Sequence, residues 1–156
     1  MKPSNALLSE VVAEMLEQFA FLFGEPDEGD PVSVQPVEYL EATIGYRADG
    51  ERGTLYIAAP KGLCREMAGN VLGLEGEEIP ADAPADALKE LSNILIGLLT
   101  ARALGVGVPC ALDPPEARTV DAEEVRRLAG VGASVRFRID ENLFVAALDG
   151  GECVER

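Results

Sequence analysis

The helical periodicity of the segment from Asp86 to Leu104 constrains the fold of this chain most strongly. At about 100° per residue, four leucines fall on one side of a helix and predict its buried face: Leu88, Leu91, Leu95 and Leu99. The same rotation places four other residues together on the outward face: Asp86, Glu90, Asn93 and Gly97. A helix with one apolar face has to pack on another layer of structure, so the rest of the chain must supply that layer.

Other segments predict the remaining elements. Helical spacing predicts an amphipathic helix from about Asn5 to Phe23 and shorter helices over 63–72 and 121–128. Alternating apolar residues predict strands over 40–46, 54–59, 106–112, 133–139 and 143–148. Two acidic segments, 24–31 and 75–84, are predicted loops. Asp82 is expected to cap the long helix, and Gly105 is expected to end it.

The order of these elements predicts an α+β fold. Short turns at Asp49-Gly50 and at 140–142 join neighbouring strands, which favours an antiparallel sheet with the helices packed on it. At 156 residues the chain is long enough to bury a substantial core, and we expect one domain over 1–156 with an ordered core of about 5–149.

Charge and residue usage exclude several classes of function. With 13 basic and 28 acidic residues the net charge is −15, which disfavours nucleic acids and anionic membrane surfaces as partners. The chain has no histidine, so Ser-His and Cys-His nucleophiles and His-ligated zinc are excluded. Three widely spaced cysteines without a CxxC motif indicate reduced thiols and a cytoplasmic protein. No segment is predicted to act as a signal peptide or to span a membrane.

The outward stripe of the long helix is the main candidate site. Taken alone, Glu90-x-x-Asn93 fits an ordinary solvated helix face. Asn and Gly are, however, poor helix formers, costing about 0.5 and about 1 kcal/mol relative to Ala. Close approach by a partner would explain both Asn93 and Gly97, and packing against another part of the same chain would explain Gly97 equally well.

This stripe resembles the signature of the CheC/CheX/FliY chemotaxis phosphatases. That signature is a Ser or Asp, then Glu-x-x-Asn, with a proline after the next strand; Asp86, Glu90 and Asn93 match it. The element order is similar to a CheX-like domain over roughly 5–149. One departure is that Pro114 and Pro115 come one or two positions early, with Glu116 at the expected position. The first helix has no Asn between Glu10 and Phe23, so a second site of the CheC kind is not expected.

The resemblance implies a function and a partner. It implies a phosphatase that acts on the aspartyl phosphate of a CheY-type response regulator in two-component signalling. Asn93 would orient the attacking water, as an amide does in small GTPases, and Glu90 would pair with the active-site lysine of the receiver domain. Magnesium would be held by the receiver, so neither a metal site nor a cofactor is expected on this chain. Asp86, Ile96 and Gly97 are the expected partner contacts, although the first-turn position of Asp86 favours a role in capping the helix.

Two alternatives remain open at this point. The same stripe could bind a receiver or a flagellar-switch protein without hydrolysis, which would make the protein a binding module. It could also be buried in a self-interface, which would make it a structural protein. The resemblance to CheX also implies a homodimer, built away from the site.

Overall fold

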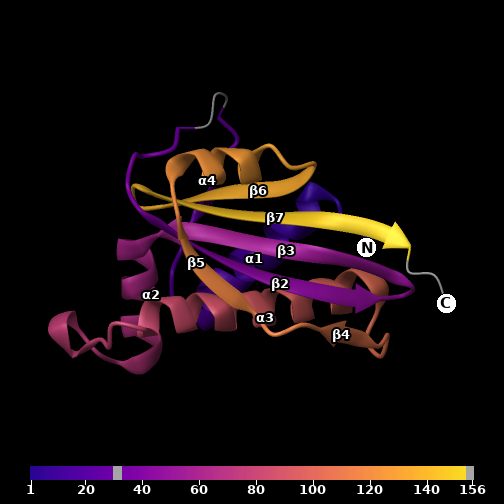
Figure 1. The fold of residues 1–156 in the computed structure, drawn as a ribbon, viewed down its shortest axis with the longest axis horizontal. Helices are drawn as coiled ribbons and strands as arrows, with labels where there is room; N and C mark the ends of the chain where they lie inside the picture. Colours follow the sequence, from indigo (N-terminus) through magenta and orange to yellow (C-terminus); the bar gives the residue numbers. More distant parts are fainter. Residues whose placement is uncertain (30–32, 154–156) are drawn as a thin grey trace.

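The computed structural model describes residues 1–29 and 33–153, the last three of these by their backbone alone. Its strands form an antiparallel sheet in the order β1-β6-β7-β3-β2-β4, and β5 also pairs with β2 (Figure 1). The strand bounds are β1 (Glu25–Pro26), β2 (Tyr39–Ala48), β3 (Glu51–Pro60), β4 (Cys110–Leu112), β5 (Glu116–Val120), β6 (Ala133–Ile139) and β7 (Asn142–Cys153). The predicted α+β class with a mainly antiparallel sheet is confirmed.

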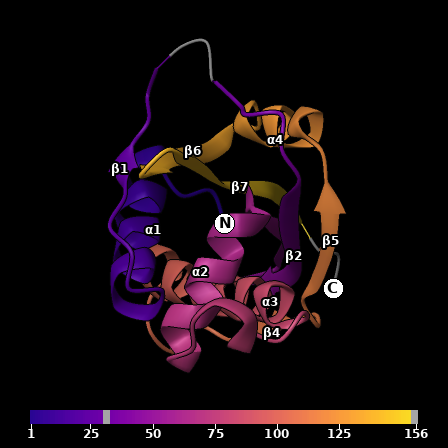
Figure 2. The same cartoon turned by 90° about the vertical axis from the view of Figure 1, so that its left-hand side faces the viewer.

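Helices cover both faces of this sheet. They are α1 (Asn5–Phe19), α2 (Lys61–Leu72), α3 (Ala83–Leu104), α4 (Ala122–Ala129) and a short 3₁₀ turn, η1 (Gly76–Glu78). In Figure 2, α4 lies on one side of the sheet, and α1, α2 and α3 lie on the other. Alternate residues of each strand therefore enter different clusters: Phe144 of β7 belongs to the main core, while Val145 packs with Val125 and Leu128 of α4.

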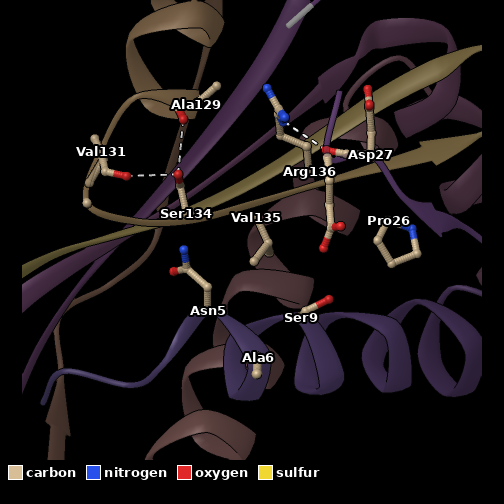
Figure 3. Close-up of a pocket in the computed structure, with 12 residues that line it drawn as sticks. Asn5, Ala6, Ser9, Pro26, Asp27, Ala129, Val131, Ser134, Val135 and Arg136 are labelled. Carbon is tan, nitrogen blue, oxygen red and sulfur yellow. Dashed lines mark hydrogen bonds between the residues drawn. The ribbon is translucent and has the colours of Figure 1, made fainter. Parts of the chain in front are cut away.

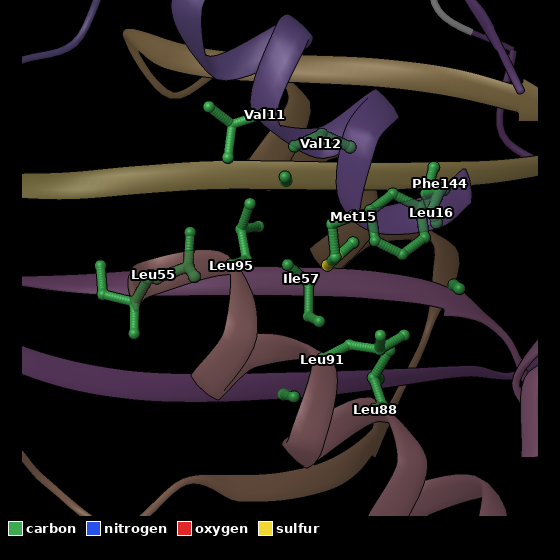
Figure 4. Packing of buried hydrophobic residues seen from close by; sticks show 14 of the residues in the cluster. Val11, Val12, Met15, Leu16, Leu55, Ile57, Leu88, Leu91, Leu95 and Phe144 are labelled. Atoms are coloured by element: carbon green, nitrogen blue, oxygen red, sulfur yellow. The ribbon is translucent and has the colours of Figure 1, made fainter. Parts of the chain in front are cut away.

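The main core joins α1 and α3 to the sheet. All four leucines predicted to anchor the long helix are buried. Figure 4 shows Leu88, Leu91 and Leu95 of α3 beside Leu55 and Ile57 of β3, with residues of α1 completing the cluster. In the last turn of α3, Arg102 donates to the carboxylates of Glu10 and Glu14 on α1. The long helix is thus fixed along its length by apolar packing and near its C-terminus by ion pairs.

Several predicted boundaries are wrong. The first helix ends at Phe19 rather than Phe23, because Phe21 adopts a left-handed backbone (φ 57°) and the Leu22 N–H donates to the Leu16 carbonyl at 3.0 Å. Strand β1 forms inside the predicted loop 24–31, the end of which lies outside the described residues. The predicted strand 106–112 is confined to 110–112.

The missed strand β5 completes the edge of the sheet. Strand β4 pairs with one half of β2 and β5 pairs with the other half, and the Asp113 N–H donates to the Gly45 carbonyl at 2.9 Å between them. Pro114 and Pro115 follow at this break, where the backbone makes no ladder hydrogen bond. The proline segment therefore divides one edge position into two short strands.

Candidate functional site

Helix α3 carries the predicted polar stripe on its solvent side. The helix begins after Asp82, has Pro84 in its first turn, and ends at Gly105 as expected. Glu90 is exposed and Asn93 is half-buried. Within the described part of the chain, no hydrogen bond or ion pair engages either side chain. An acid and an amide one turn apart are thus presented together, with their polar groups uncommitted.

Asp86 extends the stripe by one turn toward the start of the helix. Its side chain is 62% exposed and lies 3.3 Å from the Lys89 Nζ, an i,i+3 ion pair. Asp82 occupies the N-cap position without a side-chain capping hydrogen bond, and Asp86 makes none either. An acid in the first turn still favours the helix, because it faces the positive end of the helix dipole. Asp86 therefore stabilises α3 through charge, not through a cap.

Gly97 leaves an open surface one turn beyond Asn93. A Cβ built at this position meets no atom of the described chain within 4 Å. Its backbone is helical and does not have the positive φ that would require glycine. The alternative that Gly97 allows another part of this chain to pack closely is therefore wrong. Neither intramolecular packing nor backbone conformation explains a residue that weakens the helix.

The prediction for Ile96 is wrong. Ile96 is 0% exposed and belongs to the main core, so it does not lie at the edge of the open face. The buried side of α3 is wider than the four leucines indicate, because the helix packs against α1, α2 and β2 at once. Ser92 and Thr100 are buried on it too, and their hydroxyls donate to the Lys89 and Ile96 carbonyls.

Two hollows flank the stripe. The first, about 340 Å³, lies between α2 and the first turns of α3 and includes Asp86 and Glu90 among its lining residues. The second, about 640 Å³, lies toward β5 and brings Pro115 and Glu116 beside Lys89 of α3. The proline segment that follows the strand after α3 is therefore next to the helix that carries the stripe.

The second hollow contains a buried acid that sequence reasoning missed. Glu41 of β2 is 0% exposed, and Arg118 donates to one of its carboxylate oxygens at 3.1 Å while the other oxygen has no partner. Burial, together with the neighbouring Glu124 carboxylate, raises the pKa of Glu41 to about 7. Glu124 itself pairs with Arg127, which lowers the pKa of Glu124 to about 2. An acid between Leu40 and Ala42 in a predicted strand was the available sequence signal.

A further hollow of about 570 Å³ lies against α1, at the place where a second site would be expected (Figure 3). Ser9 lines it, and the Arg136 side chain is already engaged, because its Nε donates to the Asp27 carbonyl at 3.0 Å. Ser134 likewise donates to the Ala129 and Val131 carbonyls. The amide Asn5 and the acid Glu28 also line this hollow, but Asn5 lies on α1 and Glu28 follows β1, so they do not form a pair on one helix face as Glu90 and Asn93 do.

The structure supports neither a nucleophilic role for the Cys64 thiol nor a metal site in the described residues. Cys64 is buried, and burial raises the pKa of its thiol to about 12, which fits a packing residue rather than a nucleophile. Among the described residues, no group of three or more Cys, Asp or Glu side chains is arranged to hold a metal ion. Over the same residues, no helix has the length and apolar character to cross a bilayer.

The fold is similar to solved structures of CheX proteins. A CheX–CheY–BeF3–Mg complex from Borrelia burgdorferi contains a chain that matches with a TM-score of 0.70 and 13% identity, covering 96% of this chain and 99% of that one. CheX from Vibrio vulnificus matches with a TM-score of 0.69 and 16% identity, over 95% and 100% of the two chains. CheX from Desulfovibrio desulfuricans matches with a TM-score of 0.67 and 15% identity, over 94% and 97%.

Sequence comparison supplies the family. A search of curated proteins found no significant match. The family model described as chemotaxis phosphatase CheX matches residues 40–137, more than half of the chain, and this match includes all of α3 with its stripe. The chain therefore belongs to the CheX family of chemotaxis phosphatases.

Proposed function

We propose that this protein stimulates hydrolysis of the aspartyl phosphate on a CheY-type receiver domain. The observation that carries the proposal is the pair formed by Glu90 and Asn93, solvent-facing and uncommitted on a rigid helix. The bare surface at Gly97 supports it, because a second protein can approach the helix backbone there. Membership of the CheX family, and the presence of CheY in the Borrelia burgdorferi complex, support a CheY-type receiver as the partner class.

Asn93 has the chemistry to position a water molecule. A carboxamide is too weak a base to remove a proton, but its oxygen accepts from a water and its NH₂ donates to a phosphoryl oxygen. The water then attacks phosphorus in line as the bond between phosphorus and the aspartyl oxygen breaks. The carboxylate of the receiver leaves, and both protons of the water stay on the released inorganic phosphate. Positioning of this kind supplies much of the rate enhancement in phosphoryl transfer. Magnesium bound by the receiver's own carboxylates would neutralise the phosphoryl oxygens.

Glu90 holds the receiver in register. Its carboxylate is exposed and has no partner within the described chain, so a lysine ammonium at the receiver's active site can pair with it. Pairing at this point fixes the distance between Asn93 and the phosphoryl group, because both side chains project from the same face of α3, one turn apart.

The test measures the lifetime of receiver phosphate and the association of the two proteins separately. Asn93→Ala should abolish stimulated dephosphorylation and leave association near normal, while Glu90→Ala should weaken association first. Gln18→Ala and Glu17→Ala are matched controls, because both residues are exposed on α1, away from the stripe. Unchanged phosphate release in Asn93→Ala would remove Asn93 from the mechanism. Association of the wild-type protein without any hydrolysis would establish a binding module instead.

The homodimer stays a prediction. Sedimentation of the wild-type protein tests it, and a dimer whose formation hides Asn93 from solvent would favour the structural-protein alternative.

A further inference from the structure

The hollow beside Glu90 has an apolar floor. Its apolar lining comes from the C-terminal half of α2, the segment before α3 and the start of α3: Ala68, Val71, Leu72, Pro80, Ala83 and Ala87. Val71 and Leu72 are 55% and 52% exposed, which is high for large aliphatic side chains. Exposed apolar surface inside a concavity is typical of a contact site.

The rim of the same hollow is acidic. Asp82, Asp86 and Glu90 line it, one per helical turn along α3, and none of its lining residues is basic. Lys89 pairs with Asp86 from outside the hollow, and among the described residues no cation pairs with Asp82 or Glu90. The rim therefore favours a positively charged group, and the floor favours methylene groups.

Resting on the proposed function, we propose that this α2–α3 hollow receives a second basic side chain of the receiver, a lysine or arginine near the edge of its active site. The aliphatic part of that side chain lies on Val71 and Leu72, and its cationic end meets Asp82 and Asp86. Lysine and arginine bury their methylene groups in this way while the charge stays at the surface. Glu90 remains available for the active-site lysine.

This contact would also offset electrostatic repulsion between the two proteins. The chain carries a net charge of −15, which opposes the approach of an acidic receiver active site. Local pairing of opposite charges has to offset that repulsion. With Ile96 buried in the core, Val71 and Leu72 supply the apolar contact that the exposed face of α3 lacks.

A helix-stability explanation accounts for only part of the arrangement. Acids in the first turn of a helix are favourable without any ligand, which covers Asp82 and Asp86. It does not account for two exposed aliphatic residues on the neighbouring helix. The decisive variants therefore change Val71 and Asp82 in turn, and the readout is partner affinity.

The experiment titrates this protein with a CheY-type receiver domain of the same organism, loaded with beryllofluoride and Mg²⁺. Val71→Lys should weaken association about tenfold or more, because it places a cation where the incoming cation binds. Val106→Lys is the matched control, since Val106 is 95% exposed and lies outside the hollow. Added positive charge on an acidic chain should leave association unchanged or tighten it at that position. Asp82→Asn should weaken association severalfold and reduce its dependence on salt.

The outcomes separate the two proposals. Weaker binding by Val71→Lys and Asp82→Asn supports the hollow whether or not the wild-type protein hydrolyses the phosphate. Unchanged binding in Val71→Lys overturns it, even if Asn93→Ala still abolishes hydrolysis. Weaker binding in Val71→Lys with no effect of Asp82→Asn means an uncharged apolar occupant and also overturns it. If the receiver does not associate with the wild-type protein at all, both proposals fail.

Discussion

Replacing Gly97 with alanine should make the protein more stable and less effective toward its partner. The structural part follows from the site: the added methyl meets nothing within 4 Å, and the backbone there is ordinary α-helix. No clash opposes the change, so the difference in helix propensity acts alone. Glycine in a helix interior costs about 0.5 to 1 kcal/mol relative to alanine. For a chain of 156 residues this corresponds to a rise in Tm of about 1 to 4 °C.

The effect on the partner should have the opposite sign. If Gly97 is present so that the receiver can approach the helix backbone, a methyl group there separates the two surfaces. We expect the affinity for the receiver to fall about tenfold, equivalent to about 1.4 kcal/mol. Thermal and urea denaturation measure the first effect, and a receiver titration with a phosphate-lifetime assay measures the second.

Gly62→Ala provides the matched control. Gly62 lies on α2, also has open space around an added Cβ, and does not line the hollow beside Glu90. Its stability gain should be smaller because it lies in the first turn, and its receiver affinity should be unchanged. A loss of stability in Gly97→Ala would refute the conclusion that the position is open. A gain in stability with unchanged affinity would refute the reasoning that Gly97 serves close approach.

Three further perturbations test the fold around the site. The Glu41 carboxyl has a pKa of about 7 in the folded protein and a lower pKa in the unfolded chain. The free energy of unfolding should therefore fall by about 1 to 3 kcal/mol as pH rises from about 4.5 to about 7. The chain has no histidine, which would otherwise titrate in this pH range. In urea denaturation at a series of pH values, Glu41→Gln should remove this pH dependence of the free energy of unfolding. A pH dependence that remains in Glu41→Gln would assign the effect to another group. Leu95→Ala should cost about 2 to 5 kcal/mol in urea denaturation, since Leu95 is fully buried between α3 and the sheet, and a cost below about 1 kcal/mol would contradict that packing. Asp121→Ala should cost about 1 kcal/mol in thermal unfolding, because the Asp121 side chain accepts from the Glu124 N–H at 3.1 Å, and an unchanged Tm would mean that the cap is not stabilising.

Signals carried by neighbouring residues predicted much of this fold. Asp121 followed by Glu124 predicts a helix start, and both Asp49-Gly50 and the alternation over 133–139 predict hairpins; all three form as expected. Boundaries fail where no residue type signals them. Phe21 takes the left-handed conformation that ends α1, although it is neither Gly nor Asn. The apolar residues up to Phe23 are therefore predicted, wrongly, to continue the helix.

Contacts between distant segments could not be predicted in the same way. Strand β5 forms because residues 116–120 meet β2, whose residues are far away in the sequence, and a five-residue segment that is mostly exposed has little pattern of its own. Ile96 illustrates the same limit. Its position on the α3 helical wheel is fixed by the sequence, but its burial depends on how closely the neighbouring elements approach α3.

The helical character of α3, its inward-facing leucines and the joint projection of Glu90 and Asn93 follow from residue spacing alone, because 3.6-residue periodicity is a local property of the chain. How much of that helix is exposed to solvent depends instead on contacts with elements that are distant in the sequence. Packing of α1, α2 and β2 around α3 buries Ile96, leaves Gly97 bare, and forms the hollow beside Glu90. Exposure is a property of the surface left after all the elements have assembled, and no stretch of sequence encodes that surface alone.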